Sequence, residues 1–211
     1  MSDAAQTPSP VELLLPLGHS LGLDADRGAV QVRLGADVEE LGLAEFAVWS
    51  LAHGDPAGGD APWGTAGVLA AADQAGLAGA EEHLGSLVGR GLLARVEPGG
   101  PSARDLADRV RLLPLTTGRG NTAQQPLVYR LGTADHLLAV ASSTTYDLVA
   151  WAHLETSLWR ACAAAAAVAA RAGATDPGLV EPEELLTGLL TALHALLATG
   201  AVCLDTWGVA A

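Results

Sequence analysis

Arginine is the residue type whose clustering in this sequence could support chemistry. The chain has 11 basic residues, all of them Arg, and seven of these lie between residues 90 and 130 against three acidic residues. That segment carries about +4, whereas the formal net charge of the whole chain is −13. Guanidinium groups bind phosphates, so the segment predicts a contact surface for DNA, or else partners for acidic side chains of the same protein. The candidate binding residues are Arg90, Arg95, Arg104, Arg109, Arg111 and Arg119.

The histidines and cysteines do not predict a catalytic or metal site. The histidines are scattered, and none has a second His, Cys or carboxylate at the spacing of a metal-binding helix. Cys162 lies in an Ala-rich run without an accompanying His–Asp set, so we expect a small buried residue there. We therefore expect that the protein is not an enzyme and has no cofactor or metal. The six histidines are His19, His53, His83, His136, His153 and His194.

Composition and the first residues indicate a folded protein of the cytoplasm. Half of the residues are hydrophobic and only 17% are charged, which excludes a disordered chain. Cys162 and Cys203 are too few for a disulfide framework, so we expect both to be reduced. The first ten residues lack the pattern of a signal peptide. The apolar run 185–202 contains Thr, Gly and His194, which favours a buried helix, and we expect no membrane contact.

The sequence contains an internal repeat. Three pairs of segments match at offsets of 98, 97 and 109 residues, and the shifts in offset indicate loops of different length. We therefore predict a tandem duplication with about 100 residues per unit. The matched segments are LLPL (14–17 and 112–115), VQVRLGAD and LVYRLGTAD (30–37 and 127–135), and HLGSLVGRGLLARV and ALHALLATGAVCLD (83–96 and 192–205).

The repeat predicts how the chain is divided. LLPL should form the first strand of each unit, with Pro16 and Pro114 tolerated at an edge or a bulge. We expect the units to be joined rigidly at the second LLPL, without a flexible linker. The expected divisions are a disordered N-terminal tail (1–10), a first unit (11–110), a second unit (111–206) and a C-terminal tail (207–211).

Four tryptophans also take part in the repeat. The match places Trp49 on Trp151, and Trp63 on Trp159. Tryptophan at equivalent positions of duplicated units is more often core or inter-unit packing than an exposed binding surface, so we expect burial. Trp207, near the end of the chain, either docks onto the body of the protein or contacts a partner.

Each unit should contain strands first and three helices after them. VYRLG and HLLAVAS predict a hairpin, and the following SSTT supplies the N-cap of a helix that begins near Tyr146. In the first unit, LAEFAVWSLAHG predicts a helix with Leu43, Phe46 and Leu51 on one face.

The later helices have the clearer hydrophobic pattern. Second helices are predicted over 64–75 and 157–172. The third helices carry a leucine stripe at helical spacing, end in Gly and run into short strands. The predicted fold class is α+β and mainly helical.

A third helix that ends at GLL and runs into a strand resembles the winged helix-turn-helix family. The phrase L-x-x-L-V-x-x-G-L-L, present at 84–93, is frequent at the end of the recognition helix in that family. The resemblance covers most of each unit and implies two tandem winged-helix-like units. It would place Arg90 near the end of the third helix, Arg95 on the first wing strand, and residues 97–111 in the wing loop and its returning strand.

The resemblance implies a non-enzymatic adaptor that binds another protein or a peptide. Acidic winged-helix proteins without basic recognition helices often act this way, and a similar small module captures a peptide leader by strand addition beside its third helix. The alternative is a DNA-binding transcriptional regulator that uses the third helix and the Arg-rich wing of the first unit. Glu81 and Glu82 at the start of that helix disfavour DNA binding, as does the net charge of −13.

Overall fold

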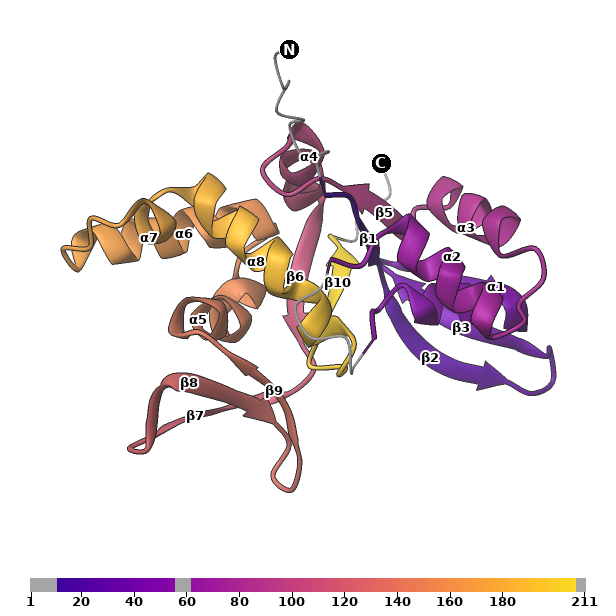
Figure 1. Ribbon diagram of the computed structural model, residues 1–211, viewed down its shortest axis with the longest axis horizontal. Coiled ribbons are helices and arrows are strands. Elements are labelled where there is room, and N and C mark those ends of the chain that lie inside the picture. The colour runs from indigo at the N-terminus through magenta and orange to yellow at the C-terminus, as the bar shows by residue number, and fades with distance from the viewer. Residues whose placement is uncertain (1–10, 56–61, 208–211) are drawn as a thin grey trace, which may run out of the picture.

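The computed structural model describes residues 11–55 and 62–207, in which two lobes flank a centre of short strands (Figure 1). The expected tail at 1–10 and the part of the C-terminal tail beyond Trp207 lie outside the described residues. We call residues 13–96 the first unit and residues 110–206 the second unit.

The first unit combines a strand meander with three helices. Its elements are β1 (Leu13–Pro16), β2 (His19–Asp24), β3 (Ala29–Leu34), β4 (Asp37–Leu41), α1 (Leu43–Leu51), α2 (Thr65–Gln74), α3 (Ala80–Gly89) and β5 (Leu93–Val96). Strands β2, β3 and β4 form one antiparallel sheet in that order, and β1 pairs with β5 in a separate ladder.

The second unit follows a similar order, but its second and last helices are longer and two short helices are added. Its elements are β6 (Val110–Pro114), β7 (Thr117–Thr122), β8 (Gln125–Gly132), β9 (Leu137–Ala141), α5 (Ser143–Trp151), the 3-10 helix η1 (Ala152–Leu154), α6 (Leu158–Arg171), α7 (Pro177–Val180), α8 (Pro182–Leu197) and β10 (Val202–Thr206). Strands β7, β8 and β9 form a second meander, and β6 pairs with β10. Helix α4 (Pro101–Arg109) connects the two units.

The ladders that open and close the two units pair in the same register. Leu14 lies opposite Arg95 in the first unit, and Leu112 lies opposite Leu204 in the second. These positions correspond through the offsets of 98 and 109 residues found in the sequence. Strands expected at 13–17 and 111–115 are thus confirmed as β1 and β6. Each LLPL proline ends a strand of a two-stranded ladder, where a missing N–H is tolerated.

The ends of α3 and α8 are also equivalent. Gly91 and Gly200 follow these helices with φ of +74° and +67°, in the left-handed region that favours glycine. The N–H of the next residue, Leu92 or Ala201, donates to the carbonyl five positions earlier, at 2.9 Å in both units. This closure turns each helix directly into the strand that completes its ladder.

The fold class is α+β, but the expectation of a mainly helical, winged-helix-like fold is wrong. Helix accounts for 44% and strand for 28% of the described residues, whose strands form four small antiparallel sheets. The strand content was underestimated because β2 (HSLGLD) and β7 (TGRGNT) are rich in Gly and poor in β-branched apolar residues. Pairing with β3 and β8 imposes the extended conformation that their own residues do not favour.

The segment expected to form the wing of the first unit is instead a helix followed by the first strand of the second unit. Residues 101–109 form α4, which begins with Pro101 and buries Ala103, Leu106 and Ala107 on one face. The next strand, β6, pairs with β10 of the second unit, and β5 pairs only with β1. Apolar spacing of three and four residues in this segment was the signal for a helix, and the burial of that face decides the outcome.

Strand β1 supplies side chains to two hydrophobic cores. Leu14 packs with the helices of the first unit, whereas Leu13 and Leu15 pack in a larger core with α4, α6 and α8. Successive side chains of a strand face opposite sides, so one strand serves both cores. The N–H of Gly18 also donates to the carbonyl of Leu204 at 2.7 Å. Strand β1 therefore contributes to both cores and packs the two units against each other.

The buried face of α1 differs from the expected one. The helix buries Val48 and Trp49, while Leu43 at its first position is 64% exposed. Leu51 is half-buried. The buried residues lie in the second half of α1, so an apolar residue in the first turn lies outside the core.

The expected tryptophan alignment is wrong by two residues. Helices α1 and α5 begin 100 residues apart, so Trp151 corresponds to Leu51 and not to Trp49. Trp49 is buried, Trp63 and Trp159 are partly buried against the cores, and Trp151 is 64% exposed. A large aromatic side chain is thus presented on the surface of the second unit.

The second hairpin and its cap follow the sequence prediction. Strands β8 and β9 pair antiparallel, with Arg130 opposite Val140. Ser142 is the N-cap of α5, and its side chain accepts a hydrogen bond from the N–H of Thr145. The helix begins at Ser143, three residues before the expected start near Tyr146.

The apolar run at 185–202 is not one continuous helix. Helix α8 ends at Leu197, and β10 begins at Val202. Within 11–55 and 62–207, no helix has both the length and the apolar character that a membrane span requires.

Candidate functional site

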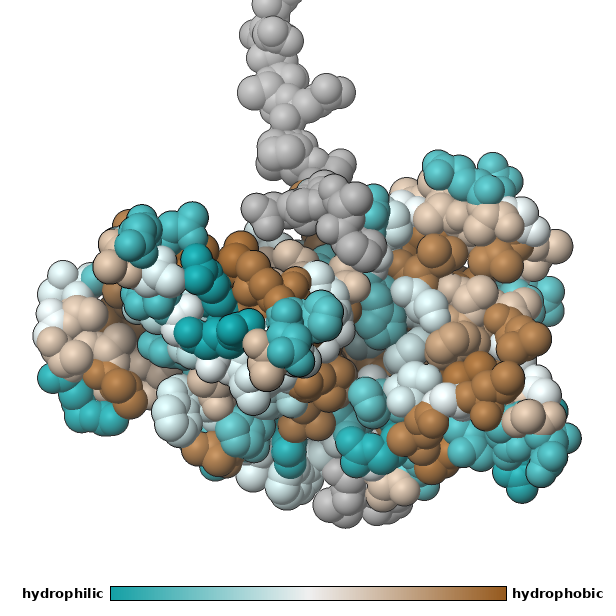
Figure 2. Space-filling model, turned by 90° about the horizontal axis from the view of Figure 1, so that it is seen from below, coloured by the Kyte–Doolittle hydropathy of each residue, from teal (hydrophilic) through white to brown (hydrophobic). Residues whose placement is uncertain are grey.

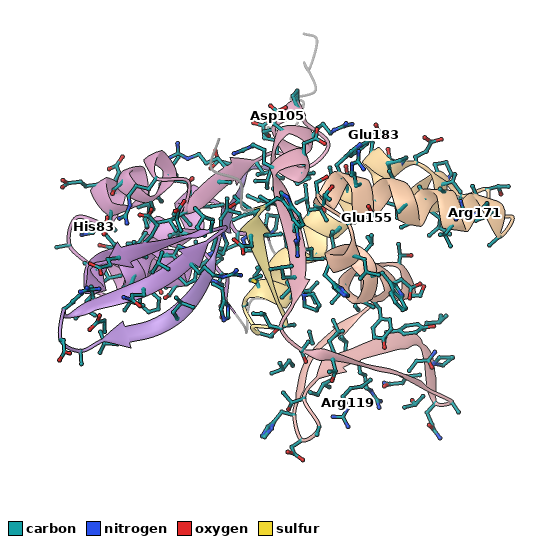
Figure 3. The ribbon with its side chains drawn as sticks, turned by 180° about the vertical axis from the view of Figure 1, so that it is seen from behind. His83, Asp105, Arg119, Glu155, Arg171 and Glu183 are labelled. Atoms are coloured by element: carbon teal, nitrogen blue, oxygen red, sulfur yellow. The ribbon has the colours of Figure 1, made fainter. Side chains whose placement is uncertain are left out.

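The six candidate arginines do not form one surface. They are distributed over the end of α3, strands β5, β6 and β7, and helix α4. Asp105, which lies between Arg104 and Arg109 in α4, is at the opposite end of the molecule from Arg119 on β7 (Figure 3). Local charge in the sequence therefore does not become a continuous positive face.

Arg90 is bound by acidic groups of its own unit. Its Nη2 lies 2.6 Å from Glu39 Oε2 and 3.0 Å from the carbonyl of Glu40, and its Nη1 lies 3.3 Å from Glu45 Oε2. The guanidinium joins the end of α3 to β4 and α1, and it occupies a backbone acceptor of the sheet edge beside α3. Strand addition at that edge would require Arg90 to leave. The equivalent position in the second unit is Thr199, whose hydroxyl donates to carbonyls of its own helix.

The two arginines of α4 also interact within the chain. Arg104 Nε lies 2.8 Å from Asp108 Oδ2, and the guanidinium lies over the ring of Trp159, 3.5 Å from its centroid. Arg109 Nε donates to the carbonyl of Asp105 at 3.1 Å. The Arg104 contact with Trp159 ties α4 to α6, whereas Arg109 is exposed on the surface of α4.

The remaining candidates lie in three separate places. Arg95 is exposed on β5 and has no side-chain hydrogen bond or ion pair within the described part of the chain. Arg119 on β7 donates to the carbonyl of Thr133 at 3.1 Å. Arg111 on β6 stacks on the indole of Trp207, with 4.5 Å between the guanidinium carbon and the ring centroid.

The second unit carries an apolar groove of about 520 Å³ between α5, η1, α6 and α7. Helix α5 presents a stripe at positions i, i+3, i+4 and i+7 to it, from Thr144 to Trp151, and α6 presents a second stripe from Ala161 to Ala169. Apart from Val168, the lining on α6 consists of alanines, whose small side chains allow close approach of a partner backbone. Leu179 of α7 and Leu185 of α8 close one end.

The groove arises from a difference between the two units. In the first unit α1 packs directly on α3, whereas in the second unit α8 packs mainly on α6 and α7, and α5 packs on η1 and β8. Figure 1 shows α5 between the sheet β7–β8–β9 and the helices α6 and α8. Helices α5 and α6 contact each other, and the groove lies along the faces that they leave uncovered.

Three large apolar side chains around the groove are exposed. Trp151 is 64% exposed, Leu154 68% and Val168 57%. Single exposed apolar residues are normal on a protein surface. Figure 2 shows separate hydrophobic patches over both lobes on the face that it views. Convergence of three such residues on one concave surface is characteristic of a binding site.

Two carboxylates also line the groove. Asp147 of α5 and Glu155, directly after η1, both lie along it. Within the described residues neither carboxylate makes a hydrogen bond or an ion pair. In Figure 3, Glu155 lies near the start of α6 and Arg171 at its far end, so the acidic part of the groove is the end away from Arg171. The site is therefore apolar with an acidic margin.

Nucleophilic chemistry is disfavoured at the two cysteines. Burial raises the pKa of Cys162 to about 12, and burial with the nearby Asp205 carboxylate raises the pKa of Cys203 to about 11. Both thiols stay protonated at neutral pH, and a thiol is a poor nucleophile compared with a thiolate. Among the described residues, no group of three or more His, Cys, Asp and Glu side chains is arranged to hold a metal ion.

Sequence reasoning missed Trp151, Leu154, Asp147 and Glu155. The misplaced match to Trp49 assigned Trp151 to the core, although the N-cap serine at 142 indicates where α5 begins. Counting from Ser142 as the N-cap places Trp151 at the position of Leu51, which is half-buried, so the repeat does not assign Trp151 to the core. No sequence pattern predicted that Leu154 and the two carboxylates lie in a groove, because that depends on where α6 packs.

Comparisons with known proteins were made at three levels. No protein-family model, no curated protein and no solved structure matches the chain.

Proposed function

We propose that the protein is a non-enzymatic adaptor of the cytoplasm that binds a basic, amphipathic helix of another protein in the groove between α5 and α6. The observation that carries this proposal is the convergence of Trp151, Leu154 and Val168 with two unpaired carboxylates on one concave surface. Neither the apolar nor the acidic part has a partner in the part of the chain that the structure describes. A ligand helix with apolar and basic residues would satisfy both.

The apolar part supplies affinity. Fully burying an exposed aliphatic side chain is worth about 1.5–3 kcal/mol, and tryptophan is the residue type most enriched at binding hot spots. A helix placed in the groove would insert its i, i+3, i+4 and i+7 side chains between the stripes of α5 and α6. The alanine floor from Ala161 to Ala169 lets the axis of such a helix approach α6 closely.

The acidic part supplies charge selection. A chain of net charge −13 attracts basic partners over long range and repels acidic ones. Asp147 and Glu155 would pair with Lys or Arg at the edges of the apolar face of the partner. Such exposed pairs contribute little to affinity at physiological salt but raise the association rate and exclude acidic helices.

DNA binding finds less support as the alternative proposal. Arg90 and Arg104 already form ion pairs with carboxylates of the chain, and Glu81 and Glu82 occupy the first turn of α3. A DNA-binding protein would show retardation of duplex DNA that weakens steeply with salt and is lost on replacement of Arg90, Arg95 or Arg111. Retardation of that kind would replace the adaptor proposal.

A titration with model helices tests the adaptor. The probe is an amphipathic Leu/Lys peptide of about 18 residues, long enough to be helical when bound, and the comparison peptide has Glu in place of Lys. We expect the Lys peptide to bind and the Glu peptide not to bind. Trp151→Ser and Asp147→Asn should each weaken binding of the Lys peptide, Trp151→Ser by about tenfold or more.

Matched variants elsewhere on the surface serve as controls. Val140 is an apolar residue of β9 that is 55% exposed, and Asp135 is an exposed acidic residue of the β8–β9 turn. Val140→Ser and Asp135→Asn should leave the affinity unchanged. If these controls weaken binding as much as the groove variants do, the peptide responds to net charge alone and the groove is not the site.

A further inference from the structure

A polar pocket of about 440 Å³ lies at the junction of the two units. Arg33 and Gly35 of the first unit line one side, and Arg111, Asp205 and Trp207 of the second unit line the other. Leu113 and Thr206 complete the lining. None of these residues belongs to the α5–α6 groove, so the pocket is independent of the proposed function.

Both oxygens of the Asp205 carboxylate in the pocket already have partners. Asp205 Oδ2 lies 2.8 Å from Arg33 Nη2, and Asp205 Oδ1 accepts a hydrogen bond from the N–H of Gly35 at 2.7 Å. The Asp205 side chain is only 5% exposed. Both of its oxygens are thus directed at the first unit, where they tie β10 to the end of β3.

Among residues 11–55 and 62–207, Arg111 has no anionic partner. It lies directly opposite Asp205 in the β6–β10 ladder, the position in which a cross-strand ion pair would form, yet Asp205 binds Arg33 instead. Trp207 holds the guanidinium by stacking, at 4.5 Å from its ring centroid. Arg111 Nε is buried and has no hydrogen-bond partner within the described residues. Buried charged donors are normally paired, so this one indicates a missing acceptor.

The charge of the pocket points to the kind of acceptor. Two guanidinium groups and one carboxylate leave it with one uncompensated positive charge, in a chain whose net charge is −13. A guanidinium stacked on an aromatic ring keeps its N–H edge free for a planar, bidentate contact with an oxyanion. Arg33 remains 43% exposed beside it and has donors that Asp205 does not use.

We propose that this pocket binds an oxyanion, the carboxylate or phosphate group of a small ligand or of a partner, with Arg111 as its main contact. The accessible Nη groups of Arg111 donate to the anion, Arg33 adds a second cationic group, and Trp207 orients Arg111. The site contains residues of both units, so the bound anion stabilises their junction. Arg95 and Arg119 are not such a site, because neither has an unpaired buried nitrogen.

Thermal unfolding of the full chain in different anions tests the site. The probes are sodium phosphate and disodium succinate, each compared with sodium chloride at equal ionic strength. A ligand that binds only the folded state raises the unfolding temperature in a saturable way. We expect such a rise with phosphate, with succinate or with both, and none with chloride. The pattern over the two probes distinguishes a phosphate site from a carboxylate site.

Substitutions then locate the effect. Arg111→Gln should abolish the saturable rise, Arg111→Lys should weaken it, and Trp207→Leu should weaken it by releasing the stacked guanidinium. Each rise is measured against the same variant in chloride, so a change in the stability of the variant itself does not enter. Arg95→Gln, on an exposed arginine of the neighbouring ladder, is the matched control and should keep the full effect.

Two results would overturn the site. One is the absence of a saturable rise with both probes in the unsubstituted chain. The other is a rise that persists in Arg111→Gln, since the anion would then bind elsewhere. Neither result bears on peptide binding at the α5–α6 groove, which is measured separately.

Discussion

Glycines in this chain fall into two groups by backbone conformation. Gly54 follows α1 with φ of +106°, and a Cβ at this position would lie 3.4 Å from Cβ of His194 and 3.5 Å from Cβ of Ala198. Gly85 lies within α3, is exposed, and a Cβ there would meet nothing within 4 Å. Gly54 is required by the turn and by its close packing on α8. Gly85 has no such requirement, and as a glycine within a helix it only lowers the stability of α3.

Alanine substitution should separate the two groups. Gly54→Ala forces a left-handed backbone on a residue with a side chain and should lower the free energy of unfolding by about 1–2 kcal/mol. Gly85→Ala should raise it by about 0.5–1 kcal/mol through helix propensity. Urea denaturation followed by far-UV circular dichroism measures both. Changes of the same sign in the two variants would contradict this assignment.

At the scale of elements, the ends of α1 and α8 meet across the unit boundary through two histidines. His194 Nε2–H donates to the carbonyl of Leu14 at 3.0 Å, and His53 Nδ1–H donates to the carbonyl of Trp49 at 3.1 Å. Burial lowers the pKa of both histidines, and the mutual proximity of the two rings lowers that of His53 further. Both rings are therefore held neutral in the contact.

Acid should weaken this contact. Because the folded-state pKa values lie below the ordinary value of 6.5, the unfolded chain binds more protons than the folded chain as pH falls below 6.5. The contribution to stability is fully present above that pH and is lost as pH falls through the lowered folded-state values. Urea midpoints measured from pH 7.5 down to pH 5 should decrease accordingly.

Variants of single histidines identify the source of the decrease. His194→Gln keeps a side-chain N–H for the Leu14 carbonyl and should flatten the pH dependence. His136→Gln, at an exposed position in the β8–β9 turn, should leave the pH dependence as it is. An equal flattening in both variants would show that general charge effects, and not the buried pair, cause the loss of stability.

At the scale of the whole molecule, β1 makes the two units interdependent. Leu15 belongs to the first unit in sequence, but it is fully buried in the core that α4, α6 and α8 build. Leu14, its neighbour, is fully buried in the core of the first unit. A strand shared in this way couples the unfolding of the two cores.

Unfolding should consequently be a single transition. Leu15→Ala removes a buried side chain and should lower the free energy of unfolding by about 2–5 kcal/mol. The midpoints from far-UV circular dichroism and from tryptophan fluorescence should shift together, since both units report on one event. Val11→Ala, at a half-exposed position just before β1, should change little. Two separate midpoints in Leu15→Ala would show that the units unfold independently.

Local features of the fold were predictable from particular residues. Ser142 marked the start of α5, the glycines at 91 and 200 marked the ends of the third helices, and the repeated LLPL marked β1 and β6. Each of these depends on a few neighbouring residues and on steric or hydrogen-bonding rules that operate over one turn. Helix α4 was missed, although its apolar spacing was present, because the resemblance to a wing was given more weight.

The sequence by itself determined the repeated order of elements and the register of the closing ladders, because turns, caps and strand alternation are encoded within short segments. Only the tertiary structure decided which charges are paired. Arg33 binds Asp205, 172 residues away, and so Arg111 is left for another anion. It also decided that α6 packs on α8 and leaves Trp151 beside an open groove. Both outcomes depend on packing between segments far apart in the chain, which no local pattern specifies.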